Sequence, residues 1–134
     1  MSINEEKERI NRLSYRIIGA AIRVHEELGP GMLETACEAC LQVELVEEGL
    51  KVVRQVPLPI TYRGRVVNCG FRVDLIVDDE ILVEVKSVER VLPVHLAQVR
   101  SYLQQTGLKL GLLINFNVKR LREGITRIVN GLPD

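Results

Sequence analysis

The feature that most constrains this chain is a pair of charged side chains inside an apolar run near its middle. Residues 71–88 read FRVDLIVDDEILVEVKSV. Their second half, residues 81–88, is largely hydrophobic, and Glu84 and Lys86 interrupt it. So apolar a segment predicts a buried β-strand, on which residues two apart point to the same face. A buried charge lowers stability unless it has a partner. The fold must therefore supply partners for a carboxylate and an ammonium group on one face of a strand.

A third charge precedes this strand. The odd positions of residues 67–77 are apolar, which predicts a further strand, and Asp74 occupies one of its even positions. If the acidic residues 78–80 form a three-residue loop, Val77 pairs with Ile81, and Asp74 lies directly opposite Glu84. Residues so placed share a face with Cβ atoms about 4.5–5.5 Å apart. A two-residue loop would send Asp74 to the other face, so the proximity of the two carboxylates depends on the register.

Two neighbouring carboxylates repel each other, which favours a proton or a bound cation between them. Carboxylate oxygens suit Mg²⁺ or Mn²⁺, ions that also hold a phosphate. A lysine on the same face can neutralise charge on that phosphate and orient a water molecule. These residue types together point to phosphodiester hydrolysis. The alternative is a structural ion-pair network on a solvated face, in which Asp74 or Glu84 pairs with Lys86 or Arg72.

The rest of the chain supplies helices and further strands. Helical periodicity predicts three helices, over residues 5–28, 32–48 and 92–106. Strands are predicted over residues 50–62, 67–77, 81–88 and 108–116, with a candidate edge strand at 125–129. The order α-α-β-β-β-α-β plus a C-terminal element predicts an α/β fold, a mixed β-sheet flanked by helices. Pro57 and Pro59 each lack a ladder donor, which favours an edge position for the first strand.

Composition narrows the class of protein. A chain of 134 residues is predicted to form a single domain over 1–134. It is 46% hydrophobic and 27% charged, a composition typical of a globular protein and not of a disordered one. No apolar run approaches the roughly 18 residues of a membrane span. The charged residues 1–12 lack the apolar part of a signal peptide, and three cysteines are an odd number for disulfides, so we expect a cytoplasmic protein.

Two of the cysteines, Cys37 and Cys40, have the C-x-x-C spacing. A zinc site would need two further ligands close by, and a redox pair would stand at a helix N-terminus after a strand. Here both cysteines fall on the apolar face of a predicted helix. We therefore expect them to be buried as small hydrophobic residues.

Asp74 followed by Glu84-Val85-Lys86 resembles the PD-(D/E)XK nuclease superfamily. The segment GMLETAC at residues 31–37 is similar to the signature of one branch, the GxxExxY proteins. The resemblance extends from about Leu13 to Val129 and includes QVPLPITYRG, PVHLAQVRSYL and TGLKLGLLINFNV. It implies a restriction-endonuclease-like core and suggests metal-dependent cleavage of nucleic acid.

The resemblance also implies roles for single residues. Asp74 and Glu84 would be ligands of Mg²⁺ or Mn²⁺, together with the backbone carbonyl of Val85, and Lys86 would be the catalytic lysine. Glu34 would be the helical acid that often completes such a site. Its alternative role is a favourable interaction with the helix dipole, because an acid in the first helical turn is stabilised in any case.

One further element fits the resemblance. Gln98 and Tyr102 lie one helical turn apart, with His95 on the same side. They resemble the QxxxY element of RecB-like members, in which the pair supports the site beside the lysine. The alternative is that they form the polar edge of an amphipathic helix.

The sequence departs from the family pattern at two positions. Cys37 stands where the signature has tyrosine, so any role of that phenol is absent here. Val73 replaces the proline of the superfamily's name. The first departure bears on activity and neither bears on the fold.

Charge gives mixed indications about a nucleic-acid partner. Lys and Arg number 18, as do Asp and Glu, which argues against strong autonomous binding to DNA. Basic residues near the C-terminus could contact phosphates or simply be solvated: Lys109, Lys119, Arg120, Arg122 and Arg127. A homodimer would concentrate such charge in one groove. The function class that competes with a nuclease is a catalytically silent binding or homo-oligomeric assembly module of the same fold.

Overall fold

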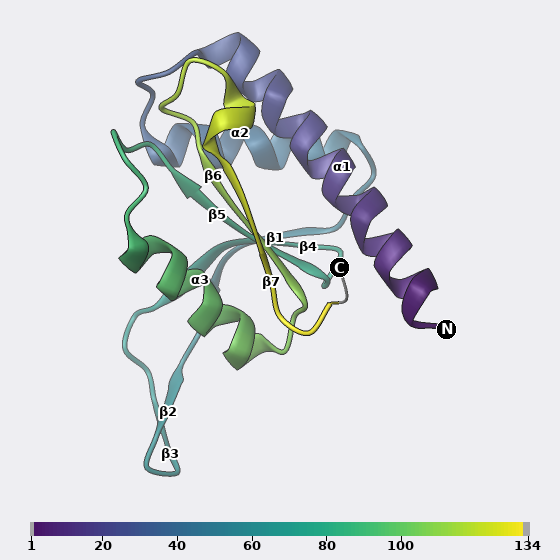
Figure 1. Cartoon of the computed structure of the whole chain (residues 1–134). Coiled ribbons are helices and arrows are strands. Elements are labelled where there is room, and N and C mark those ends of the chain that lie inside the picture. The colour runs from purple at the N-terminus through teal and green to yellow at the C-terminus, as the bar shows by residue number, and fades with distance from the viewer. Residues whose placement is uncertain (1, 133–134) are drawn as a thin grey trace.

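The computed structural model describes residues 2–132 and shows a central sheet with helices on both faces (Figure 1). The helices are α1 (Ile3–Leu28), α2 (Glu34–Glu47) and α3 (Pro93–Thr106), with a short 3₁₀ helix η1 (Leu121–Gly124). The strands are β1 (Val52–Pro57), β2 (Ile60–Tyr62), β3 (Arg65–Val67), β4 (Arg72–Val77), β5 (Ile81–Lys86), β6 (Leu110–Asn115) and β7 (Ile125–Val129). Helices α1 and α2 pack on one face of the sheet and α3 packs on the other.

The main sheet has five strands in the order β1-β4-β5-β6-β7. Strands β5 and β6 are parallel and the other neighbours are antiparallel, so the sheet is mixed. The predicted α/β class is therefore confirmed. Strand β1, which contains Pro57, lies at one edge as predicted, and β7 lies at the other.

The predicted element order is wrong in one respect. The expected strand over 50–62 divides into β1 and β2, and the expected strand over 67–77 divides into β3 and β4. Strands β2 and β3 form a separate two-stranded hairpin that projects from the body of the molecule (Figure 1). The division occurs at Pro59 on the outgoing side and around Gly70, which has φ 78°, on the returning side. Neither residue type continues a regular ladder.

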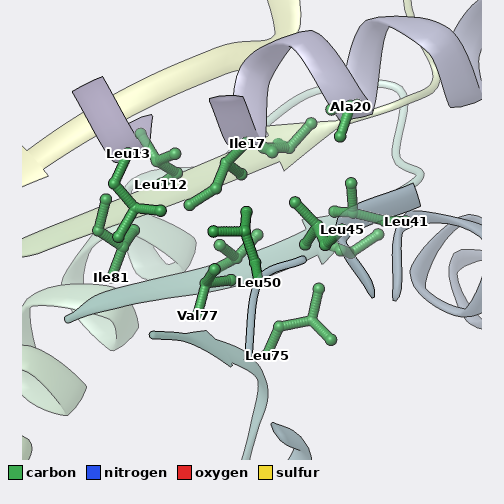
Figure 2. Packing of buried hydrophobic residues seen from close by; sticks show 14 of the residues in the cluster. Leu13, Ile17, Ala20, Leu41, Leu45, Leu50, Leu75, Val77, Ile81 and Leu112 are labelled. Carbon is green, nitrogen blue, oxygen red and sulfur yellow. The ribbon is translucent and has the colours of Figure 1, made fainter. Parts of the chain in front are cut away.

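The larger core lies between the sheet and helices α1 and α2 (Figure 2). The spacing of three and four residues along α1 buries Leu13, Ile17 and Ala20 against the sheet, as the periodicity predicts. Leu41 and Leu45 of α2 complete this layer. Burial of so continuous an apolar face fixes both helices on the sheet.

The layer on the other face depends on a glycine. A Cβ atom on Gly111 of β6 would lie 2.8 Å from the Val99 side chain and 3.3 Å from Leu103, both on α3. The missing side chain lets α3 approach β6 closely. Val99 and Leu103 are fully buried there, as the helical pattern predicts.

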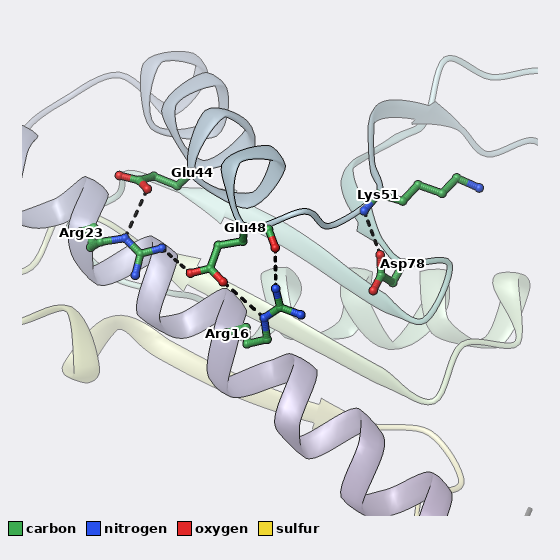
Figure 3. Close-up of polar contacts among 6 residues, drawn as sticks. All are labelled: Arg16, Arg23, Glu44, Glu48, Lys51 and Asp78. Atoms are coloured by element: carbon green, nitrogen blue, oxygen red, sulfur yellow. Dashed lines mark hydrogen bonds and ion pairs between the residues drawn. The ribbon is translucent and has the colours of Figure 1, made fainter.

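Polar contacts join the outer surfaces of α1 and α2 (Figure 3). Arg16 donates to the backbone carbonyl of Glu48 at 2.6 Å, and Arg23 donates to the carboxylates of Glu44 and Glu48 at 3.2 and 2.8 Å. These two arginines lower the pKa of Glu48 by hydrogen bonding, Arg23 most. The contacts lie at the surface and add to the apolar packing that holds the two helices.

Candidate functional site

The register of the β4–β5 hairpin decides whether the predicted charges meet. Val77 pairs with Ile81, and the three acidic residues between them form the loop. Asp78 and Asp79 both have positive φ, of 50° and 56°, and the Asp78 carboxylate accepts the Lys51 amide hydrogen at 2.8 Å (Figure 3). Of the two loop lengths that the sequence allows, the structure has the three-residue loop. Continued along the strands, this register sets Asp74 opposite Glu84.

The ladder between the two strands ends before it reaches these residues. Leu75–Val83 is the last registered pair, although β4 begins at Arg72 and β5 continues to Lys86. Side chains replace the missing ladder bonds. The Val85 amide donates to Asp74 Oδ2 at 2.8 Å, and the Asp74 amide donates to Glu84 Oε1 at 3.0 Å. Each carboxylate thus binds the backbone of the opposite strand, which holds the two acids side by side.

Both carboxylates are strongly perturbed. Glu84 is 4% exposed, and burial raises its pKa to about 8, with a further increase from the negative charge of Asp74. Burial also raises the pKa of Asp74 to about 6, and the charge of Glu38 adds to this increase. A cation bound between two such acids would lower the pKa of both, so that they release their protons and become its ligands. This environment favours binding of a positive ion.

Lys86 ends β5 on the same face as Glu84. The apolar residues Val83 and Val85 belong to the core beside α1 and α2, whereas Leu82 packs on the α3 side. Alternation along the strand therefore places Glu84 and Lys86 on the α3 side. The lysine is half-buried, and its charge lowers the pKa of Glu84 against the larger effect of burial. No ion pair within residues 2–132 involves Lys86, so its ammonium group is available to a ligand.

Glu38 is a site residue that the sequence analysis missed. It is 4% exposed in α2, pairs with Arg54 at 2.8 Å, and accepts from the Gln55 side-chain amide at 2.9 Å. Its charge contributes to the raised pKa of Asp74. The available indication was an acid between Cys37 and Cys40, on a face predicted to be buried.

Glu34, the predicted helical acid, lies one turn earlier. It is exposed at the start of α2, and its carboxylate accepts the Ser87 amide hydrogen at 3.3 Å. The Ser87 hydroxyl donates to the Met32 carbonyl at 2.5 Å. These bonds hold the first turn of α2 over the end of β5, directly after Lys86. Glu34 therefore borders the site while Glu38 lies deeper beside Asp74.

Gln55 of β1 connects the two deeper acids. Its side-chain amide lies 2.9 Å from Glu38 Oε1 and 3.5 Å from Asp74 Oδ1. Its backbone has φ 53°, in the left-handed region, and the β1–β4 register omits the pair that Gln55 and Asp74 would form. Non-glycine residues with such backbone strain concentrate at functional sites.

The three site residues predicted on α3 differ from one another in burial and in their contacts. Tyr102 is 4% exposed, and its ring centroid lies 6.5 Å from that of Phe71, which precedes β4. Burial raises the pKa of Tyr102, and the negative charges of Glu84 and Asp74 raise it further. Gln98 is half-buried one turn earlier. His95 has a local role instead, because its Nδ1 accepts the Leu92 amide hydrogen at 3.0 Å where α3 begins.

The donor set fits a hard divalent cation. Asp74 and Glu84 present carboxylate oxygens from opposite strands, and Mg²⁺ is typically held by one or two carboxylates with water and phosphate as the other ligands. Across the described part of the chain, no three or more His, Cys, Asp or Glu side chains form a group that could hold a metal. Two carboxylates, not a complete protein cage, are therefore what the fold offers such an ion.

Other predicted features lie away from this site. Cys37 is fully buried in the core and Cys40 packs against it, as predicted for the C-x-x-C pair, and burial raises the pKa of the Cys37 thiol. Of the C-terminal basic residues, Lys109 pairs with Glu6, and Arg127 donates to the Asn11 side chain at 2.7 Å. Both are thus held against α1.

Among the comparisons with known proteins, one family model matches the chain. A family model described as PD-(D/E)XK nuclease superfamily matches residues 11–128. The searches of curated proteins and of solved structures return no match. Between Ser2 and Leu132, no helix has both the length and the apolar character needed to cross a bilayer. On the strength of the family match, which spans β4, β5 and the helices around them, the chain belongs to the PD-(D/E)XK nuclease superfamily.

Proposed function

We propose that this protein is a metal-dependent nuclease that hydrolyses phosphodiester bonds in nucleic acid. The observation that carries the proposal is the open end of the β4–β5 pair. There Asp74 and Glu84 each bind the backbone around the other, and Lys86 follows on the same face as Glu84. Membership of a nuclease superfamily supports the same conclusion.

Asp74, Glu84 and the backbone carbonyl of Val85 would hold Mg²⁺ or Mn²⁺. Such an ion supplies charge neutralisation at the phosphate and activation of a bound water. Lys86 would donate hydrogen bonds to the scissile phosphate and stabilise the negative charge that develops on it. Its freedom from ion pairs within residues 2–132 suits this role.

The surrounding residues would position these groups. Glu38 would act through Gln55, which donates to it and approaches Asp74. Glu34 would border the substrate position at the end of β5. Tyr102, with Gln98 one turn earlier, would support the carboxylates from α3 and restrict the entry of water.

Other attributes of the chain are part of the same proposal. We place it in the GxxExxY branch, with Cys37 buried where the signature has tyrosine. We also propose one domain over 1–134, a cytoplasmic location and assembly as a homodimer.

A second candidate function is a catalytically silent module of the same fold. The favouring observation is that Asp74 and Glu84 already satisfy one oxygen each on backbone amides, while Arg54 neutralises Glu38. Such a network could serve structure alone. In that case the protein would bind a partner or a second copy without cleaving anything.

A cleavage assay separates the two candidates. Labelled single- and double-stranded DNA and RNA are incubated with Mg²⁺ or Mn²⁺ and either the wild type, Lys86→Ala or Lys51→Ala. Lys51 is the matched control, because it is an exposed lysine that pairs with Asp79 at the opposite end of the hairpin. A nuclease loses activity only in Lys86→Ala. No cleavage of any substrate by the wild type, with no metal binding in calorimetry, would support the silent module.

A further inference from the structure

The β2–β3 hairpin is an appendage that the main core does not explain. Tyr62 pairs with Arg65, so Arg63 and Gly64 form a two-residue turn, and both have positive φ, as a type I′ turn requires. Every residue from 61 to 70 is exposed. The ribbon thus extends into solvent with both of its faces free (Figure 1).

The hairpin carries positive charge at its tip, and a further arginine follows where β4 begins. Between Pro57 and Val73 the sequence contains three arginines, Arg63, Arg65 and Arg72, and no acidic residue. Among the residues that the structure describes, none of these arginines forms an ion pair. The Arg63 guanidinium instead lies over the Tyr62 ring, 5.6 Å from its centroid. In a chain with zero formal net charge, this is a local concentration of unneutralised cations.

Exposed apolar side chains accompany these charges. Tyr62 is 59% exposed and Val66 is 71% exposed, on opposite faces of the ribbon according to the pairing. Their exposure leaves one apolar side chain free on each face of the ribbon for contact with a ligand. Arginine with an aromatic and a β-branched residue is a combination suited to phosphates and to the edges and sugars of nucleotides.

The hairpin connects directly to the candidate site. Its two ends continue into β1 and β4, and the Leu58 amide donates to the Phe71 carbonyl at 2.9 Å where they separate. A cavity of about 220 Å³ lies at this root and is lined in part by Phe71 and Arg72. Asp74 follows Arg72 by two residues. The hairpin therefore leaves the sheet two residues before the strand reaches Asp74.

We infer that the β2–β3 hairpin is a clamp for double-stranded DNA, an inference that rests on the proposed nuclease function. The major groove of B-form DNA, about 12 Å wide, admits a two-stranded β-ribbon. Arg63 and Arg65 contact the backbone phosphates of the duplex, which covers Tyr62 and Val66. Arg72 contacts a further phosphate between the hairpin and the site. In that groove the backbones of both strands flank the ribbon, so phosphates are present on both of its sides.

The test measures duplex binding without cleavage. Fluorescence anisotropy of a labelled 20-base-pair DNA is recorded at several salt concentrations, with every variant built on Lys86→Ala. We expect Arg63→Ala/Arg65→Ala to weaken binding at least about tenfold and to reduce the salt slope by about 2, since each phosphate contact contributes about 0.9. Arg12→Ala, at a highly exposed arginine of α1, is the control that leaves both quantities unchanged. The substitutions are on the surface, and circular dichroism verifies folding.

A gain of binding provides a second test that misfolding cannot imitate. Thr61 is exposed opposite Val66, and Thr61→Lys adds one cation to the ribbon. We expect it to tighten duplex binding and to increase the salt slope by about 1.

Several results would overturn the inference. The first is an unchanged duplex affinity and salt slope in the double arginine variant. The second is a loss of affinity in that variant for the single strand of the same sequence and not for the duplex. The third is a wild-type dimer that Tyr62→Ser/Val66→Ser dissociates without affecting duplex binding. Failure of the proposed nuclease is distinguishable, because the wild type would then cleave nothing while the hairpin arginines still determined duplex affinity.

Discussion

The two ends of the β4–β5 pair are built from the same strands and behave in opposite ways. At the closed end, Val77 and Ile81 pair within a regular ladder, both are fully buried, and a tight turn joins them. At the open end the ladder has stopped, and the carboxylates of Asp74 and Glu84 accept the amide hydrogens instead. One end is fixed by backbone pairing and apolar burial, the other by buried acids.

This difference shows how a fold keeps charged groups inside an apolar sheet. Regular pairing would direct the Asp74 and Val85 amides to carbonyl groups of the neighbouring strand. Separation of the strands frees these amides to donate to the side chains of Asp74 and Glu84, so the buried polar groups of both strands keep hydrogen-bond partners. The closed end supplies the stability that this arrangement requires.

The largest expected effect tests the open end. Asp74→Asn keeps the shape of the side chain and removes its charge, so we expect metal-dependent cleavage to fall at least about 1,000-fold, equivalent to about 4 kcal/mol. The free energy of unfolding should change far less. Single-turnover cleavage and urea denaturation measure the two quantities. Equal loss of activity in Lys51→Ala would show that cleavage does not depend specifically on the open end.

The next effect tests the closed end. Ile81→Ala removes a fully buried side chain beside the turn and should lower the free energy of unfolding by roughly 2–5 kcal/mol. The fraction that remains folded should still cleave. Guanidinium denaturation together with activity per folded molecule checks this. An unchanged stability would mean that the closed end does not support the fold as described.

A smaller effect concerns pH and Glu84. Because burial raises its pKa to about 8, the folded protein keeps a proton there that the unfolded chain releases above pH 4.5. Stability of the metal-free protein should therefore fall as pH rises from about 5 to 8, by roughly 1–3 kcal/mol. Mg²⁺ should restore it at pH 8. Glu84→Gln should flatten the pH profile, whereas Glu47→Gln, at an exposed position of α2, should leave it intact.

The smallest effect distinguishes two acids of α2. Glu38→Gln should lower the cleavage rate roughly 10- to 100-fold, as is typical when a residue that positions metal ligands is altered. Glu34→Gln should have the smaller effect, because Glu34 is exposed and bonds only the Ser87 amide among the described residues. Metal titration followed by cleavage ranks the two variants. The reverse order would assign the helical acid to Glu34.

The sequence predicted the closed end better than the open one. Helical periodicity located α1, α2 and α3, whereas the sequence left the length of the loop before Ile81 open, and the structure decides for the register that sets Asp74 opposite Glu84. These features depend on local patterns of apolar and turn residues. The division of the strands at Pro59 and Gly70 was missed, because alternation continues across both breaks.

The missed site residues depend on tertiary contacts. Glu38 stands in a helix whose apolar pattern reveals burial but not its partner Arg54, 16 residues away. Nothing in the sequence around Gln55 predicts its left-handed backbone, which arises where β1, β4 and α2 meet. The positions of such residues are determined by packing between distant segments, and one sequence contains no record of that packing.

The backbone of Gln55 has a consequence for laboratory evolution of this protein. A glycine would adopt φ 53° without strain, but Gln55→Gly would also take a hydrogen-bond donor from the buried carboxylate of Glu38. The two effects on stability oppose each other, so a library selected only for heat resistance should keep the glutamine. Selection for stability alone would then preserve the amide that spans Glu38 and Asp74, although it never tests activity.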